Sequence, residues 1–87
     1  MNAQEKTRQE KTRQEKIVEI VKRVSKNDVP PDPEESLFDS GYLDSFALTD
    51  MVGEIEREFG ITIPDSDLTP RRFDSIDKID GYIAKCL

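Results

Sequence analysis

Apolar side chains recur at helical spacing in three separate segments, and this pattern constrains the fold more than any other feature. Residues 17–24 carry apolar side chains at positions i, i+3, i+4 and i+7, which is one face of an α-helix. A second such segment runs from about Ser45 to Phe59, and a third begins at Asp74 or Ser75. No alternating strand pattern competes with these segments. The sequence therefore predicts an all-α fold.

The ends of these segments carry residues that start and stop helices. Gly60 follows the second segment at the position where a left-handed residue commonly ends a helix. Thr69 and Pro70 are predicted to be the N-cap and first residue of a short additional helix. The expected apolar face of the second helix is Leu48, Met51, Val52, Ile55 and Phe59. That of the last helix is Ile76, Ile79, Ile83 and Leu87. We expect a small four-helix bundle with three main helices and one short helix.

A long connection, residues 27–44, joins the first two main helices. Its helix-breaking residues include Pro30, Pro31, Pro33 and Gly41. Because so long a loop is uncommon in a compact domain, we expect it to be ordered and functional. The residues expected to attach it to the core are Leu37, Phe38 and Leu43.

The N-terminal region contains a pentapeptide repeat, QEKTR-QEKTR-QEK, over residues 4–16. Five residues turn a helix by about 500°, so equivalent residues spread around the axis and form no apolar stripe. We therefore predict a charged, solvated helical extension over residues 1–16, followed by one domain over residues 17–87. An alternative for the extension is a docking arm for a partner.

The composition excludes several classes of function. The chain of 87 residues contains no histidine and one cysteine, Cys86, which excludes a disulfide framework and a cysteine zinc site. The acidic loop residues do not follow the spacing of an EF-hand. We therefore expect no metal site and no enzymatic activity. Cys86 is interpreted as a small, partly buried helix residue.

Hydropathy and charge bear on location and partners. No apolar run approaches the roughly 18 residues of a membrane span, so we expect a cytoplasmic monomer without one. Residues 1–16 carry five Lys and Arg against three Glu, a net charge of +2. Since the whole chain has a net charge of −6, residues 17–87 have a net charge of −8. An acidic domain argues against nucleic-acid binding and favours partners with basic patches.

The dipeptide Asp-Ser occurs four times, with its serine at positions 40, 45, 66 and 75. Ser40 lies within the predicted loop and Ser66 beside the short helix. Ser45 and Ser75 are both predicted to open helices, where a serine usually caps the first turn. The helix N-terminus also favours negative charge, so a serine there can carry a phosphate group.

The residue after each serine distinguishes the last two candidates. On a wheel of 100° per residue, Phe46 lies about 160° from the centre of the apolar face of its helix. Ile76, in contrast, belongs to the apolar face of the last helix. An exposed Phe46 beside Ser45 is typical of a binding hot spot, although Phe46 could alternatively fold under the preceding loop. The polar face of the second helix includes the candidate docking residues Asp50, Glu54, Glu56 and Arg57.

Three stretches with these features resemble the acyl carrier proteins of the phosphopantetheine-binding carrier family. They are SLFDSGYLDSF (residues 36–46), EREFGITIP (56–64) and DLTPRRFDSI (67–76), in the family's order and spacing. The resemblance covers about residues 17–87. Leu usually follows the serine in this family, and Phe46 is similar instead to D-alanyl carriers and some specialised bacterial carriers.

The resemblance implies a four-helix fold with 4′-phosphopantetheine attached to Ser45. A phosphopantetheinyl transferase would donate this group from coenzyme A, and Asp44 would shape the transferase site. The arm would hold an acyl or aminoacyl group as a thioester and present it to enzymes with basic patches. Such carriers act in fatty-acid, polyketide and other lipid biosynthesis.

Two other readings remain open from the residues alone. The same bundle could be an unmodified adaptor or complex subunit, in which case Ser45 would have no chemical role. An enzyme is disfavoured because no histidine, nucleophile–base pair or metal-ligand cluster is present.

Overall fold

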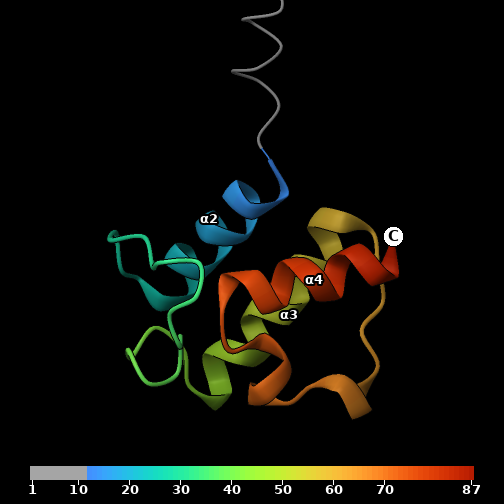
Figure 1. Ribbon diagram of the computed structural model, residues 1–87. Helices are drawn as coiled ribbons and strands as arrows, with labels where there is room; N and C mark the ends of the chain where they lie inside the picture. The colour runs from blue at the N-terminus through green and yellow to red at the C-terminus, as the bar shows by residue number, and fades with distance from the viewer. Residues whose placement is uncertain (1–11) are drawn as a thin grey trace, which may run out of the picture.

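The computed structural model describes residues 12–87, in which every regular element is helical (Figure 1). The three α-helices are α2 (Arg13–Ser25), α3 (Ser45–Phe59) and α4 (Ile76–Cys86). Two short 3₁₀ helices, η1 (Asp65–Asp67) and η2 (Pro70–Phe73), lie between α3 and α4. The all-α prediction is confirmed, and α3 has the predicted bounds. Most of the predicted N-terminal extension, residues 1–11, lies outside the described residues.

Helix α2 begins at the end of the second copy of the repeat. Thr12 is its N-cap: the Glu15 backbone N–H donates to Thr12 Oγ1 (3.1 Å), and the Thr12 N–H donates to Glu15 Oε1 (2.9 Å). This reciprocal pair is a capping box, for which a Thr followed by a Glu three residues later is the sequence signature. The helix therefore crosses the expected boundary at residue 16. The division into an extension and a domain stays a prediction.

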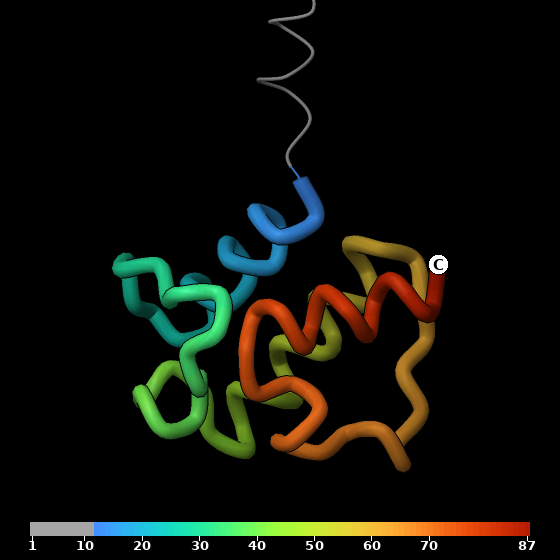
Figure 2. The backbone as a smooth tube through the Cα atoms, in the orientation of Figure 1, coloured from blue at the N-terminus to red at the C-terminus, as the bar shows by residue number. Residues whose placement is uncertain are grey.

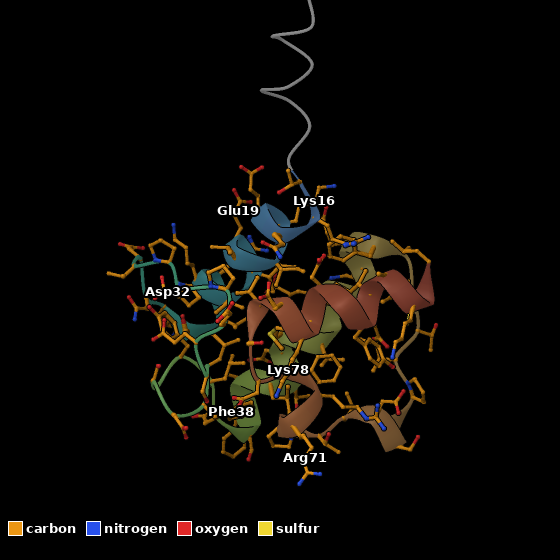
Figure 3. All side chains as sticks on the ribbon, in the orientation of Figure 1. Lys16, Glu19, Asp32, Phe38, Arg71 and Lys78 are labelled. Carbon is orange, nitrogen blue, oxygen red and sulfur yellow. The ribbon has the colours of Figure 1, made fainter. Side chains whose placement is uncertain are left out.

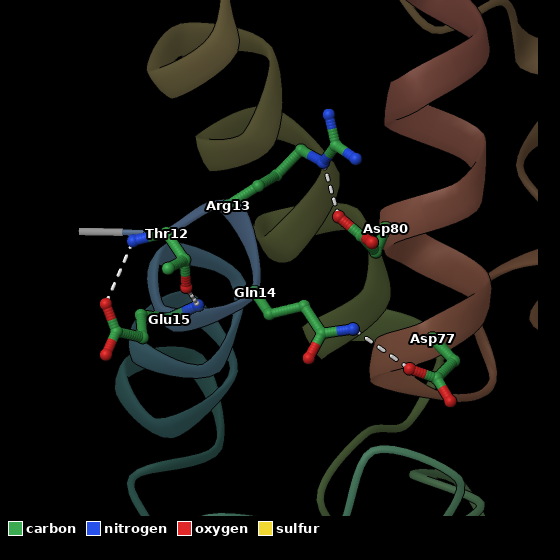
Figure 4. Close-up of polar contacts among 6 residues, drawn as sticks. All are labelled: Thr12, Arg13, Gln14, Glu15, Asp77 and Asp80. Atoms are coloured by element: carbon green, nitrogen blue, oxygen red, sulfur yellow. Dashed lines mark hydrogen bonds and ion pairs between the residues drawn. The ribbon is translucent and has the colours of Figure 1, made fainter. Parts of the chain in front are cut away.

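Polar side chains at the start of α2 contact the other two helices. Arg13 Nε donates to Asp80 of α4, and Gln14 Nε2 donates to Asp77 Oδ1 over 3.0 Å (Figure 4). Lys16 Nζ lies 3.6 Å from Glu58 Oε2 of α3. Pairs as exposed as these contribute about 0–1 kcal/mol each. They show that the end of the repeat takes part in the packing of the bundle.

The core lies where the apolar faces of α2, α3 and α4 meet (Figures 1 and 2). Its largest fully buried side chains are Phe73, Ile17, Ile20, Leu37, Met51, Ile55, Ile76, Ile79, Ile83 and Val21. The predicted face of α3 is buried except for Phe59, which is partly buried. Burial of these side chains supplies most of the stability, at about 25 cal/mol per Å² of apolar surface.

Two predictions about the C-terminal residues are wrong. Leu87 is 70% exposed, although it was assigned to the apolar face of α4. Cys86 is exposed rather than partly buried. Both residues follow Ile83, the last buried residue in the chain, and therefore lie beyond the packed part of α4.

The predicted short helix is present as η2, but with 3₁₀ geometry. Pro70 is its first residue, as expected, and Phe73 lies in the core. Thr69 is its N-cap, as predicted, with an extended backbone, although the Thr69 side chain makes no capping hydrogen bond. Phe73 also packs against the ring of Tyr82, with centroids 5.1 Å apart.

Helix η1 is attached to α4 through Tyr82, whose hydroxyl donates to Asp67 Oδ2 over 2.6 Å. Burial, followed by this hydrogen bond, raises the pKa of Tyr82 to about 12. A phenol held neutral in this way is a stable donor at neutral pH. The segment between α3 and η2 is therefore fixed at a second point.

The long loop between α2 and α3 is held against the start of α4, and Figure 2 shows it passing beside that helix. The Leu37 N–H donates to the Asp74 carbonyl oxygen (2.6 Å), and Ser36 Oγ donates to Asp74 Oδ1 (2.8 Å). The Phe38 N–H also reaches Asp74 Oδ1, at 3.4 Å. Leu37 and Leu43 are buried as predicted, and Phe38 is partly buried. The loop is therefore ordered up to the first residue of α3.

Replacing Asp74 with alanine is expected to lower the free energy of unfolding by about 1–3 kcal/mol, because it leaves the Ser36 hydroxyl and the Phe38 N–H without their acceptor. Urea titration of the two proteins measures this loss. The matched control is Asp39→Ala, which changes an exposed aspartate of another Asp-Ser pair and is expected to cost less than about 0.5 kcal/mol. Equal losses in the two variants would show that Asp74 does not anchor the loop.

Candidate functional site

The N-terminus of α3 places Ser45 one residue inside the helix. Asp44 is the N-cap, with an extended backbone and a carboxylate that accepts from the Ala47 N–H over 2.8 Å. Ser45 is the first helical residue and is exposed. Within residues 12–87 its hydroxyl makes no hydrogen bond; the Thr49 hydroxyl instead donates to its carbonyl oxygen (3.2 Å). The aspartate thus satisfies the helix end and leaves the serine hydroxyl free.

The equivalent dipeptide at the start of α4 is shifted by one residue relative to its helix. There Ser75 is the N-cap, and its Oγ accepts from the Lys78 N–H over 3.1 Å. Ser75 is buried, with 6% of the residue's surface exposed, and Asp74 lies before the helix and binds the loop. Since both Asp and Ser are good N-caps, the sequence alone could not decide which residue of each pair would cap.

The other two serines of Asp-Ser pairs lie elsewhere. The Ser40 hydroxyl hydrogen-bonds to the Glu35 carboxylate and is the main cause of a lowered pKa of Glu35; the Asp32 N–H contributes less. Ser66 lies in the three-residue helix η1, which is too short to have a helix dipole of any size. Of the four serines, Ser45 alone combines exposure, a free hydroxyl and the N-terminus of an α-helix.

Phe46 is 84% exposed, the largest exposure among the large hydrophobic residues that the structure describes. The wheel prediction is confirmed, and the alternative in which Phe46 folds under the loop is wrong. An exposed aromatic ring next to a free hydroxyl can provide apolar contact area to an enzyme acting on that hydroxyl.

The acidic residues of α3 are mostly bound within the protein. Glu54 accepts from Arg23 Nε (2.9 Å) and Nη2 (2.6 Å). Glu56 accepts from the Ile63 N–H (2.8 Å) and so fixes the chain after α3. Together with the Lys16–Glu58 pair, these contacts leave Asp50 as the one α3 carboxylate without a partner among residues 12–87. The helix is therefore less available as an acidic docking face than its sequence indicates.

The free negative charge lies instead in the loop before Ser45. Residues 27–44 contain six acidic residues and no Lys or Arg: Asp28, Asp32, Glu34, Glu35, Asp39 and Asp44. All but Glu35 are exposed. The described residues contain no group of three or more side chains arranged to hold a metal ion. Glu35 and Asp44 accept backbone hydrogen bonds, which leaves four loop carboxylates without a partner among residues 12–87, against one on α3. The acidic loop was visible in the sequence, but only the structure shows this difference.

Comparison with known proteins decides what kind of site this is. The model of the phosphopantetheine attachment site family matches residues 15–78, which include the start of α3. The chain belongs to this family of phosphopantetheine-binding carriers. It is 33% identical to the D-alanyl carrier protein of Streptococcus suis (strain 05ZYH33) over 71 residues, which cover 82% of this chain and 90% of that protein. It is 34% identical to the D-alanyl carrier protein of Streptococcus uberis (strain ATCC BAA-854 / 0140J) over 64 residues, covering 74% and 81% of the two chains.

A phosphopantetheine-binding carrier holds an acyl or aminoacyl group on a covalently attached 4′-phosphopantetheine arm, and this is the function of the chain. The arm supplies the thiol that forms the thioester, so the carrier itself is not an enzyme. It depends on partner enzymes for attachment and loading of the arm. The free, exposed hydroxyl at the start of α3 fits attachment of such a group. No helix in the described part of the carrier is both long and apolar enough to span a bilayer.

The different positions of the two serines predict different effects on stability. Ser75→Ala removes a capping acceptor and is expected to lower the free energy of unfolding by about 1 kcal/mol. Ser45→Ala removes no hydrogen bond and is expected to change it by less than about 0.5 kcal/mol. Urea titration of the unmodified proteins measures both. A loss for Ser45→Ala as large as that for Ser75→Ala would mean that Ser45, too, stabilises its helix.

Proposed function

We propose that Ser45 is the attachment residue for 4′-phosphopantetheine. The observation that carries this proposal is the division of roles at the start of α3: Asp44 caps the helix through Ala47, so the Ser45 hydroxyl is free to react. The backbone N–H groups and dipole of this 15-residue helix favour the negative charge of a phosphodiester at that position. Asp44 fixes the first turn and shapes the surface that a transferase meets.

The modification follows from ordinary phosphoryl chemistry. Ser45 Oγ attacks the phosphorus of coenzyme A that bears the pantetheine. A new Oγ–P bond forms, and the bond to the adenosine 3′,5′-bisphosphate leaving group breaks. The hydroxyl proton passes to a base of the transferase. The contribution of the carrier is an exposed nucleophile held in a fixed first turn.

We further propose that the cargo is an aminoacyl group of the D-alanyl type rather than a fatty-acyl or polyketide intermediate. Two observations support this: the relatives compared above are D-alanyl carrier proteins, and Phe46 occupies the position after the serine. Forming a thioester from a free amino acid requires an enzyme that first activates the carboxylate. Since the modification uses coenzyme A from the interior of the cell, the chain would act in the cytoplasm. We also expect it to act as a monomer.

The proposed partner surface surrounds Ser45 and includes Phe46, Asp50, Glu54, Glu56 and Arg57. Phe46 would be the apolar anchor, and Asp50 the free carboxylate of α3. Glu54 and Glu56 hold Arg23 and the Ile63 N–H, so they would act mainly by shaping the surface. The acidic loop over residues 27–44 would meet the basic patches of the transferase and loading enzymes and increase their association rates.

Intact-mass measurement tests the attachment residue. Incubation with coenzyme A and a promiscuous phosphopantetheinyl transferase is expected to add the mass of one 4′-phosphopantetheine to the wild-type chain and to Ser75→Ala, and none to Ser45→Ala. Since Ser75→Ala is the less stable of the two variants, misfolding cannot explain this pattern. A wild-type chain that gains no mass would instead support the unmodified adaptor.

Phe46→Ala is expected to lower kcat/KM for the same transferase by about tenfold, the loss of roughly 1.4 kcal/mol that an exposed aromatic anchor can contribute. Its Tm should change by less than about 2 °C, because the ring is not in the core. Leu87→Ala is the control, since it removes another exposed hydrophobic side chain, 70% exposed, at the end of α4 and outside the proposed partner surface. A large fall in Tm, or equal kinetic losses in both variants, would contradict the anchor role.

A further inference from the structure

A hollow of about 350 Å³ lies between the end of α2 and the middle of α3. Lys26, at the C-cap of α2, lines one side. Asp50, Gly53 and Arg57 of α3 line the other. On a helical wheel these three residues and Phe46 fall within about 60° of one another. The hollow therefore continues the exposed strip of α3 that begins next to Ser45.

The charge of this hollow is opposite to that of the domain. Arg23 and Glu54 also line it, but they neutralise each other through two hydrogen bonds. Lys26 and Arg57 make no ion pair with any other residue in the range 12–87, and they outnumber the free carboxylate of Asp50. An acidic domain thus presents a locally positive hollow on the helix that carries the proposed attachment serine.

Gly53 lines the hollow, and nothing in the packing of the fold requires a glycine there. It lies in the middle of α3 with an ordinary negative φ, where glycine is less favourable than alanine. A Cβ atom placed on it would meet only Arg57 Nη1, at 4.0 Å, which is an ordinary contact with the flexible end of a side chain. A missing side chain that the fold does not require leaves room for the backbone of another molecule to approach closely.

We propose that this hollow is a docking site for the phosphopantetheinyl transferase, and that it receives an acidic side chain of that enzyme between Lys26 and Arg57 while its backbone crosses Gly53. The inference rests on the proposed modification of Ser45. It adds to the proposed partner surface a positive site distinct from the acidic loop. Two contacts of opposite charge on either side of Phe46 fix the orientation of a partner more firmly than one acidic patch.

Two glycine variants test the close approach, with the promiscuous phosphopantetheinyl transferase and coenzyme A as the probe. Gly81 is a matched control, because it too lies inside a helix, α4, with no atom near a Cβ placed on it; Gly81 is exposed and Gly53 is half-buried. Both Gly53→Ala and Gly81→Ala are expected to raise Tm by a few degrees. Gly53→Ala is expected to lower kcat/KM about tenfold, whereas Gly81→Ala stays within about twofold of wild type. If Gly53 had only a structural role, Gly53→Ala would change Tm and leave kcat/KM at the wild-type value.

Two charge reversals test the electrostatic part. Arg57→Glu is expected to lower kcat/KM about tenfold or more, while Lys78→Glu, the same change of charge on α4 outside the hollow (Figure 3), stays within about threefold. Wild-type rates for Gly53→Ala, or equal losses in both charge variants, would overturn the docking site while leaving the modification of Ser45 in place. A wild-type chain that accepts no phosphopantetheine would overturn the proposed function and this inference together.

Discussion

The architecture around the site depends on the attachment of the long loop to the start of α4. Asp74 provides a carbonyl oxygen for Leu37 and a carboxylate for Ser36 and Phe38. These bonds satisfy the Leu37 and Phe38 N–H groups and add to the hydrogen bonds within the loop, such as those from the Tyr42 and Leu43 N–H groups to the Leu37 carbonyl oxygen. They also hold Leu37 and Leu43 in the core. The chain consequently enters α3 from a fixed direction, with Asp44 positioned to cap it.

The sequence predicted the elements better than their junctions. Periodicity located α3 and α4 and most of the core, because burial of one helix face is a repeated signal over many residues. It gave the wrong environment for Leu87, because periodicity does not show where a neighbouring element stops. It gave no start for α2, since the repeat carries no apolar stripe; the Thr12–Glu15 capping box is the signal that marks this start.

At the candidate site, too, the sequence predicted some features and not others. The exposure of Phe46 follows from the angle between it and the apolar face, so it could be predicted. Which residue caps α3 could not, because Asp44 and Ser45 have similar capping propensities. The pairing of Glu54 with Arg23 and of Glu56 with the Ile63 N–H depends on tertiary contacts. Composition therefore overstated the negative charge that α3 offers to a partner.

The cap at Asp44 separates the chemistry of the site from the folding equilibrium. A group attached to Ser45 replaces no native hydrogen bond within the described residues. Its effect on the folding equilibrium is therefore limited to the interaction of the phosphodiester with the N-terminus of α3, which favours the folded state by about 0.3–1 kcal/mol. By thermodynamic linkage, an interaction made only in the folded state stabilises that state by its own free energy. The protein can thus fold before its arm is added, and the arm can be removed or exchanged without unfolding α3. Folding of the carrier and modification of Ser45 are therefore only weakly coupled.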